Sequence, residues 1–137
     1  TAIFLNSRGK VSEGPGMCFF IVRDGVPITP SISNDILESV TRDAILHIIK
    51  DHFDIAPVER DIDRSELSLA DEAFFCGTAW EVTPILSIDR SDIGKGTIGN
   101  MTKSLQEKFF SICDGTDESY PEWRYPVYGE KTRKAAE

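Results

Sequence analysis

Residues 70–84 read Ala-Asp-Glu-Ala-Phe-Phe-Cys-Gly-Thr-Ala-Trp-Glu-Val-Thr-Pro. Two runs of β-forming residues, 72–76 and 81–86, flank a tight Gly-Thr-Ala corner, which predicts two strands joined at that corner. Gly77 permits a positive φ or a close approach of the backbone to a ligand. Thr78 adds a hydroxyl beside consecutive free backbone N–H groups, and such groups at a bend can bind an anion. An ordinary hairpin corner explains the same residues, so this segment alone leaves both interpretations open.

Outward from this corner, the chain alternates between predicted strands and helices. Residues 18–23 and 26–29 are rich in β-forming residues, and the Asp24-Gly25 pair between them is the strongest short signal for a hairpin. The other predicted elements are a helical turn at 33–38, an amphipathic helix from an N-cap at Thr41 to about residue 53, a strand at 58–62, a helical turn at 65–70, a strand at 81–89 with Pro84 at an edge or bulge, and an amphipathic helix at 101–113. This alternation predicts a mixed α/β domain.

Composition excludes several classes of function. The net charge of −8 and the pI near 4.8 argue against binding to nucleic acid or to an anionic membrane, because both need clustered Lys and Arg. No apolar run approaches the ~18 residues of a membrane span. The length of 137 residues fits one domain. The first five residues read as a strand rather than a signal peptide, an opening that fits either a trimmed chain or a piece of a longer protein.

The three cysteines, Cys18, Cys76 and Cys113, are an odd number at wide spacing. Neither His47 nor His52 has a thiol or acidic partner at a zinc-like spacing, so we expect neither a disulfide framework nor a metal site. Three free thiols fit a reducing compartment, and we therefore expect a cytoplasmic protein. Cys76, beside the Gly-Thr-Ala corner, is either a redox thiol or a small buried hydrophobe.

Three segments carry residues suited to a flat, anionic ligand. Glu13 lies in Ser12-Glu13-Gly14-Pro15-Gly16, where the glycines leave room for such a ligand, although a solvated glutamate in a turn is the usual case. Residues 39–41 start a helix, whose free N–H groups favour phosphate, although simple capping is the commoner role. The third segment is the corner at 77–79. Together they would suit pyridoxal phosphate, because a carboxylate opposite the pyridine nitrogen keeps that nitrogen protonated.

Linked motifs stand in a fixed order along the chain. They are Val11-Ser12-Glu13-Gly14, Asp24-Gly25-(two)-Ile28-Thr29-Pro30, Ile36-Leu37-(two)-Val40-Thr41-Arg42-Asp43, Leu69-Ala70-Asp71-Glu72-Ala73-Phe74, Gly77-Thr78-Ala79-(one)-Glu81-Val82-Thr83-Pro84 and Ile98-Gly99-(two)-Thr102-Lys103-(one)-Leu105-Gln106-(two)-Phe109-Phe110. In this order they resemble the C-terminal half of the branched-chain amino acid aminotransferases, which are class IV, fold-type IV pyridoxal-phosphate enzymes. The resemblance implies the mixed-sheet, pseudo-barrel C-terminal domain of the D-amino acid aminotransferase-like fold. Residues 1–115 would form this cofactor-binding domain, and residues 116–137 an irregular C-terminal arm.

The same resemblance implies a role for five residues. Glu13 would partner the pyridine nitrogen of the cofactor. Val40 and Thr41 would bind its phosphate through their backbone amides and the Thr41 hydroxyl. Thr78 would also reach the phosphate, and the amides of Thr78 and Ala79 would face the substrate carboxylate. The activity implied is transfer of the amino group of Leu, Ile or Val to 2-oxoglutarate.

The chain also departs from the pattern of this family. Met17-Cys18 stands where relatives often have Glu-Asn, Ser39 where many have Gly, and Trp80 where many have a small residue. Trp80 either alters the substrate pocket or packs against a neighbour. D-amino acid aminotransferases and aminodeoxychorismate lyases share the scaffold, whereas the Gly-Thr-Ala corner and the tail motif at 122–128 favour the branched-chain members.

The lysine that forms the Schiff base in this family has no match in the chain. It would lie upstream of Glu13, farther back than Thr1. The lysines present are Lys10, Lys50, Lys95, Lys103, Lys108, Lys131 and Lys134. We therefore expect no catalytic residue here, but the cofactor-binding domain of a parent enzyme, inactive without its N-terminal domain and prone to self-associate as a homodimer. A non-catalytic binding module on the same scaffold is the alternative.

Overall fold

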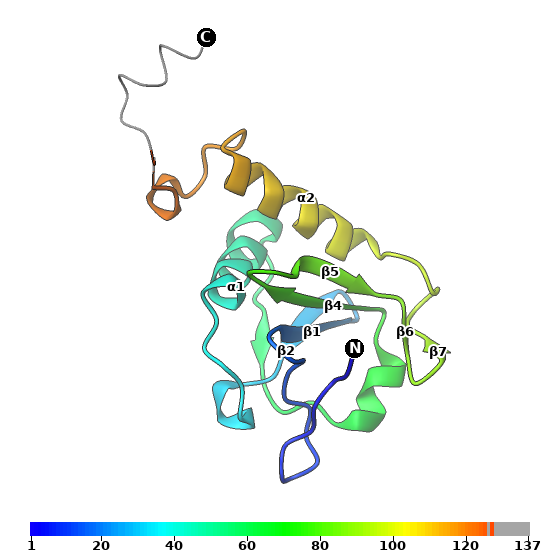
Figure 1. The fold of residues 1–137 in the computed structure, drawn as a ribbon. Coiled ribbons are helices and arrows are strands. Elements are labelled where there is room, and N and C mark those ends of the chain that lie inside the picture. The colour runs from blue at the N-terminus through cyan, green and yellow to red at the C-terminus, as the bar shows by residue number, and fades with distance from the viewer. Residues whose placement is uncertain (126, 128–137) are drawn as a thin grey trace.

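The computed structural model describes residues 1–125 and 127. Its centre is a five-stranded sheet in the order β3-β2-β1-β4-β5 (Figure 1). The strands are β1 (Cys18–Arg23), β2 (Val26–Thr29), β3 (Val58–Glu59), β4 (Glu72–Gly77) and β5 (Glu81–Ile85). The β2–β3 pair is parallel and the other pairs are antiparallel, so the sheet is mixed, as predicted. A two-stranded ribbon of β6 (Ser87–Ile88) and β7 (Ser91–Asp92) follows β5.

The hairpin between β1 and β2 forms where the sequence predicts it. Asp24 and Gly25 have φ values of 51° and 75°. Two consecutive left-handed residues are typical of the type I′ turn, whose twist matches that of the flanking strands. The strand pair around the Gly-Thr-Ala corner is also confirmed, with Gly77 opposite Glu81 at its tip. Pro84 lies on β5, the edge strand, as expected of a residue without an N–H group.

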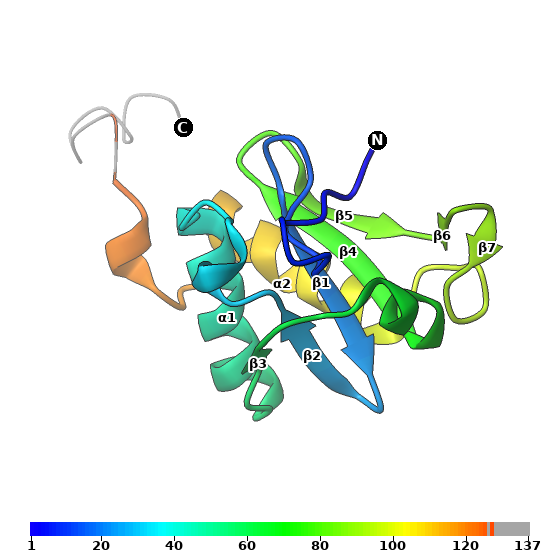
Figure 2. The same cartoon turned by 90° about the horizontal axis from the view of Figure 1, so that it is seen from below.

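Two α-helices, α1 (Val40–Phe53) and α2 (Asn100–Asp114), cover one face of the sheet (Figures 1 and 2). Successive residues of a strand point to opposite faces. Phe20 and Phe74 therefore face the helices, where their rings stack at 4.9 Å, whereas Phe19 and Phe75 face the other side. That other side is covered by buried residues of the loops and of η2 (Arg64–Leu69), namely Val11, Ile62, Leu67 and Ile93. The sheet thus separates two apolar cores.

Several predicted boundaries are wrong. The N-cap of α1 is Ser39, whose hydroxyl accepts the N–H of Arg42 at 3.3 Å, and Thr41 lies inside the first turn. The strand predicted at 58–62 is limited to two residues, because β2, with which it pairs, is followed by Pro30. The helical turn predicted at 33–38 is η1 (Ile32–Asn34). The strand predicted at 81–89 breaks between β5 and β6.

The described part of the arm predicted at 116–137 is irregular apart from η3 (Pro121–Trp123). Tyr120 stacks on Trp123 at 4.0 Å, and its hydroxyl donates a hydrogen bond to Asp51 of α1 at 2.8 Å. Burial, with a smaller effect of Asp51, raises the pKa of Tyr120 to about 12. Residue 126 and residues 128–137, including part of the tail motif, lie outside the described residues.

Within residues 1–125 and 127, no helix is both long and apolar enough to cross a membrane. The same part of the chain contains no group of three or more His, Cys, Asp or Glu side chains placed to hold a metal ion.

Candidate functional site

Glu13 lies in a tight turn between the N-terminal segment and β1. The turn is closed by hydrogen bonds between the backbones of Gly14 and Met17. The carboxylate of Glu13 accepts the backbone N–H of Leu37 at 3.1 Å, so the residue is tied to the segment before α1. Gly14 is required by packing within the chain, because a Cβ there would lie 2.7 Å from Cγ of Met17 and 2.9 Å from a ring carbon of Phe75.

The start of α1 presents free backbone donors. Ser39 caps the helix and thereby satisfies the N–H of Arg42, while its carbonyl accepts the N–H of Asp43 at 3.0 Å. The N–H groups of Val40 and Thr41 make no hydrogen bond within the described part of the chain. The Val40 side chain is 88% exposed. Two amide donors therefore lie at the positive end of the helix dipole, where an anion is favoured, and phosphate binding by residues 40 and 41 stays a prediction.

The corner between β4 and β5 lies beside the turn that carries Glu13 (Figure 2). A Cβ on Gly77 would lie 3.1 Å from the carbonyl oxygen of Gly16 and 3.5 Å from Cα of Met17. Gly77 does not have a positive φ; the left-handed residue of this corner is Glu81, with φ 53°. The close approach that needs glycine is therefore to the chain itself. Thr78 and Ala79 are both exposed at the tip.

Two buried thiols lie between these segments. Cys18 of β1 and Cys76 of β4 are directly opposite each other, and both face the helices. The Cys18 thiol also donates to the carbonyl oxygen of Leu37 at 3.8 Å. The neighbouring Cys18 thiol raises the pKa of Cys76 well above its ordinary value, and burial adds to this effect. The Cys76 thiol lowers the pKa of Cys18, an effect that burial opposes, and the Ser39 hydroxyl lowers this pKa further.

Within the described residues, the three predicted binding segments are therefore linked through Leu37, Cys18 and Cys76. Leu37 contacts both Glu13 and Cys18, and it lies three residues before Val40. Cys76, opposite Cys18, lies two residues before Thr78. Sequence analysis placed residues 39–41 at a helix start, but it missed the links made by Leu37, Cys18 and Cys76 and the role of Ser39 as the N-cap. Ser39 could have been found, because serine is a better N-cap than threonine. The contacts of Leu37 could not, because they join residues distant in the sequence.

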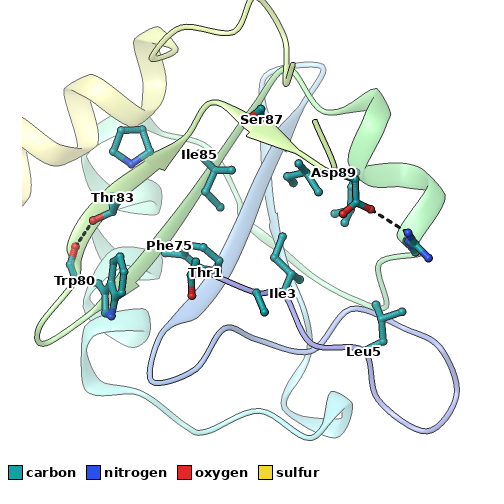
Figure 3. A pocket seen from close by; sticks show the side chains of 14 residues that line it. Thr1, Ile3, Leu5, Phe75, Trp80, Thr83, Ile85, Ser87 and Asp89 are labelled. Atoms are coloured by element: carbon teal, nitrogen blue, oxygen red, sulfur yellow. Dashed lines mark hydrogen bonds and ion pairs between the residues drawn. The ribbon is translucent and has the colours of Figure 1, made fainter. Parts of the chain in front are cut away.

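Trp80 lies away from these links, beside a cavity of about 620 Å³ (Figure 3). Its ring lies 6.5 Å from that of Phe75, and its carbonyl oxygen accepts the Thr83 hydroxyl at 2.5 Å. Ile3 and Leu5 of the N-terminal segment also line this cavity. A second cavity, of about 450 Å³, lies at the start of α2 between β4 and α1, where Glu72, Met101 and Phe53 contribute to its wall. Neither of these two cavities is lined by the five predicted binding residues.

A family model for amino-transferase class IV matches residues 1–88. A probable branched-chain-amino-acid aminotransferase of Aquifex aeolicus is 48% identical over 127 residues, which are 93% of this chain and 41% of that relative. The branched-chain-amino-acid aminotransferase of Pseudomonas aeruginosa is 43% identical over 90% of this chain and 39% of its own length.

Solved structures show the same similarity. The branched-chain amino acid aminotransferase of Thermobaculum terrenum in its PLP form (holo-form) is 47% identical, with a TM-score of 0.91 over 93% of this chain and 42% of that one. The enzyme of Thermoproteus uzoniensis with norvaline is 45% identical, with a TM-score of 0.87 over 93% of this chain and 41% of that one. The chain thus spans about two fifths of the length of the relatives that it matches.

Proposed function

Because this chain belongs to the class IV aminotransferases and has the mixed α/β architecture of their fold-type IV structures, we propose that it is the cofactor-binding domain of a branched-chain amino acid aminotransferase. The full-length protein would use pyridoxal phosphate to transfer the amino group of Leu, Ile or Val to 2-oxoglutarate. The Schiff-base lysine would come from outside this chain, in the part of the relatives that the chain does not span. The proposal includes a cytoplasmic location, which three free thiols support.

The donors and acceptors of the site fit pyridoxal phosphate. Bound there, the cofactor would supply an electron-withdrawing ring that stabilises the charge left on the substrate's α-carbon when its proton is removed. The Glu13 carboxylate would hold a proton on the pyridine nitrogen. The amides of Val40 and Thr41 and the hydroxyls of Thr41 and Thr78 would bind the phosphate; within residues 1–125 and 127, these hydroxyls make no other hydrogen bond. The amides of Thr78 and Ala79 would orient the substrate carboxylate.

The contact between Glu13 and Leu37 is the observation that carries the proposal. It brings a carboxylate to the segment that leads directly into the free amides of α1. A carboxylate and a phosphate site that belong to one ligand must be held at a fixed separation, and this 3.1 Å hydrogen bond joins the two segments that provide them. A solvated glutamate in an independent turn would have no such link to the helix.

The test uses the full-length protein loaded with pyridoxal phosphate. We expect 2-oxo acids to form from Leu, Ile and Val when 2-oxoglutarate is the acceptor. Glu13→Gln removes the negative charge that faces the ring nitrogen, and we expect kcat to fall about a hundredfold or more. Glu38→Gln, a change at an exposed glutamate close to α1, is the matched control and leaves kcat unchanged.

Four other outcomes would overturn the proposal in different ways. Turnover of D-alanine without turnover of leucine would indicate a D-amino acid aminotransferase, and formation of pyruvate from aminodeoxychorismate would indicate a lyase on the same scaffold. Bound pyridoxal phosphate with no turnover of any of these substrates, or failure to bind it, would favour a non-catalytic module.

A further inference from the structure

Both backbone polar groups of Leu37 make hydrogen bonds. Its N–H donates to the Glu13 carboxylate at 3.1 Å, and its carbonyl oxygen accepts the Cys18 thiol at 3.8 Å. The Leu37 side chain is 69% exposed, so packing of that side chain does not fix its position. The two polar contacts therefore hold the Leu37 backbone, and both come from one short stretch of chain, residues 13–18.

Of the two residues that contact the Leu37 backbone, Cys18 is held more rigidly than Glu13. It lies at the start of β1, is 3% exposed, and is paired with Cys76 on β4. On the β4 side, its neighbour in the sheet is therefore a hydrogen-bonded strand. Glu13, by contrast, lies in a turn and is partly exposed. A hydrogen-bonding group on a strand positions the Leu37 segment relative to the sheet more precisely than a group on a turn does.

The Cys18 thiol is also close to the helix cap itself. The Ser39 hydroxyl is near enough to lower the pKa of Cys18, together with the larger effect of the Cys76 thiol, while burial opposes both. Ser39 in turn caps α1 through the N–H of Arg42. The thiol thus faces the last residues before the free amides of Val40 and Thr41.

From these contacts we propose that Cys18 is a positioning residue for the phosphate end of the cofactor site. Its thiol holds the Leu37 carbonyl and so fixes where the N-terminus of α1 meets the phosphate. Glu13, which carries the ring end of the site, contacts the same residue through the Leu37 N–H. This inference rests on the proposed function, because it assumes that the phosphate lies at Val40 and Thr41.

The role predicts an effect that depends on the phosphate group. Cys18→Ala removes the donor and leaves the Leu37 carbonyl without it. We expect the affinity of the full-length apo-protein for pyridoxal phosphate to fall about threefold to fivefold, as for loss of one weak hydrogen bond. The affinity for pyridoxal, which has no phosphate, changes less than about twofold on the same scale. Both are measured by titration followed through the absorption of the bound ligand.

Rescue and control variants distinguish loss of positioning by Cys18 from a general loss of structure. Cys18→Asn supplies an amide N–H donor of similar size and restores the affinity for pyridoxal phosphate, whereas Cys18→Ser, with a shorter side chain, restores it only in part. Cys113→Ala removes an exposed thiol elsewhere and changes neither affinity. Thermal unfolding of each apo-variant verifies that the protein is folded.

The outcomes distinguish the two proposals. Equal losses of affinity for both ligands in Cys18→Ala, or no loss for either, would overturn the positioning role while the proposed function stands. If Cys18→Ala does not fold, the comparison of Cys18→Asn with Cys18→Ser decides in the same way. A wild-type protein that binds neither ligand would overturn the proposed function and the positioning role with it.

Discussion

A glutamate from the sheet, Glu72, caps helix α2 in place of a local side chain. Its carboxylate accepts the N–H of Thr102 at 2.7 Å, the Thr102 hydroxyl at 2.6 Å and the N–H of Met101 at 3.1 Å. The N-cap residue, Gly99, has no side chain, and a Cβ there would lie 1.9 Å from Cδ of Glu72. Gly99 therefore leaves the space in which a negative charge meets the positive end of the helix.

We expect Glu72→Ala to lower the free energy of unfolding by about 2–3 kcal/mol, because it leaves the buried Thr102 hydroxyl and two amides without their acceptor. Urea denaturation of the purified chain measures the change. Glu107→Ala, at an exposed glutamate on the same helix, is the control and changes stability by less than about 0.5 kcal/mol. Equal effects of the two substitutions would show that the cap contributes nothing specific.

The predicted binding residues show what sequence can predict at this scale. Motifs in the sequence singled out Glu13, Thr41 and Thr78. The residue types alone show that Glu13 has a carboxylate and that the two threonines have hydroxyl donors. Cys18 was predicted as a spaced thiol at the start of a strand, but not as the link between segments that its position opposite Cys76 makes it. Such a link depends on strand register, which a list of residue types does not contain.

At the scale of elements, the sequence predicts turns and helix faces correctly where neighbouring residues determine them. The type I′ turn at Asp24-Gly25 and the apolar face of α2 are set by backbone φ and by helical spacing, and both are confirmed. The predicted strand at 58–62 is wrong beyond its second residue, because its length depends on the end of β2 rather than on its own alternation. Ile62 is buried all the same, in the core opposite the helices.

The element η2 is attached to the sheet by an ionic cluster around Glu66. Its carboxylate accepts two hydrogen bonds from Arg60, at 2.5 and 2.9 Å, and one from Arg23 of β1 at 3.2 Å. The hydrogen bonds from Arg60 are the main reason that the pKa of Glu66 is lowered, and those from Arg23 add to the effect, while burial opposes it. The Glu66 side chain is only 12% exposed, so solvent screens these contacts weakly.

A lowered pKa means that the folded state favours the charged carboxylate. The resulting stability is present above the ordinary carboxyl value of 4.5 and is lost as the pH falls through the lowered value. We expect Glu66→Gln to cost about 1–2 kcal/mol at neutral pH, and this difference from wild type to shrink as the pH falls below 4.5. Denaturant titrations at neutral pH and below pH 4.5 test this. A stability difference between the variant and wild type that is independent of pH would contradict it.

At the scale of the whole molecule, the segment before and into α1 is both the candidate phosphate site and an exposed apolar surface. Ile32, Leu37 and Val40 are 54%, 69% and 88% exposed. Three large apolar side chains exposed within nine residues are typical of a surface that another polypeptide covers. The net charge of −8 acts in the opposite direction, because it makes copies of the chain repel one another.

These two features predict self-association that depends on salt. We expect the purified 137-residue chain to sediment as a mixture of monomer and dimer whose dimer fraction rises with concentration and with added salt, since salt screens the repulsion. Leu37→Ser combined with Val40→Ser lowers that fraction, because it removes apolar area from the surface that associates. Leu69→Ser, at a leucine of η2 that is 59% exposed, is the matched control and leaves it unchanged. Monomer at every concentration and salt level would show that this surface does not bind a second copy.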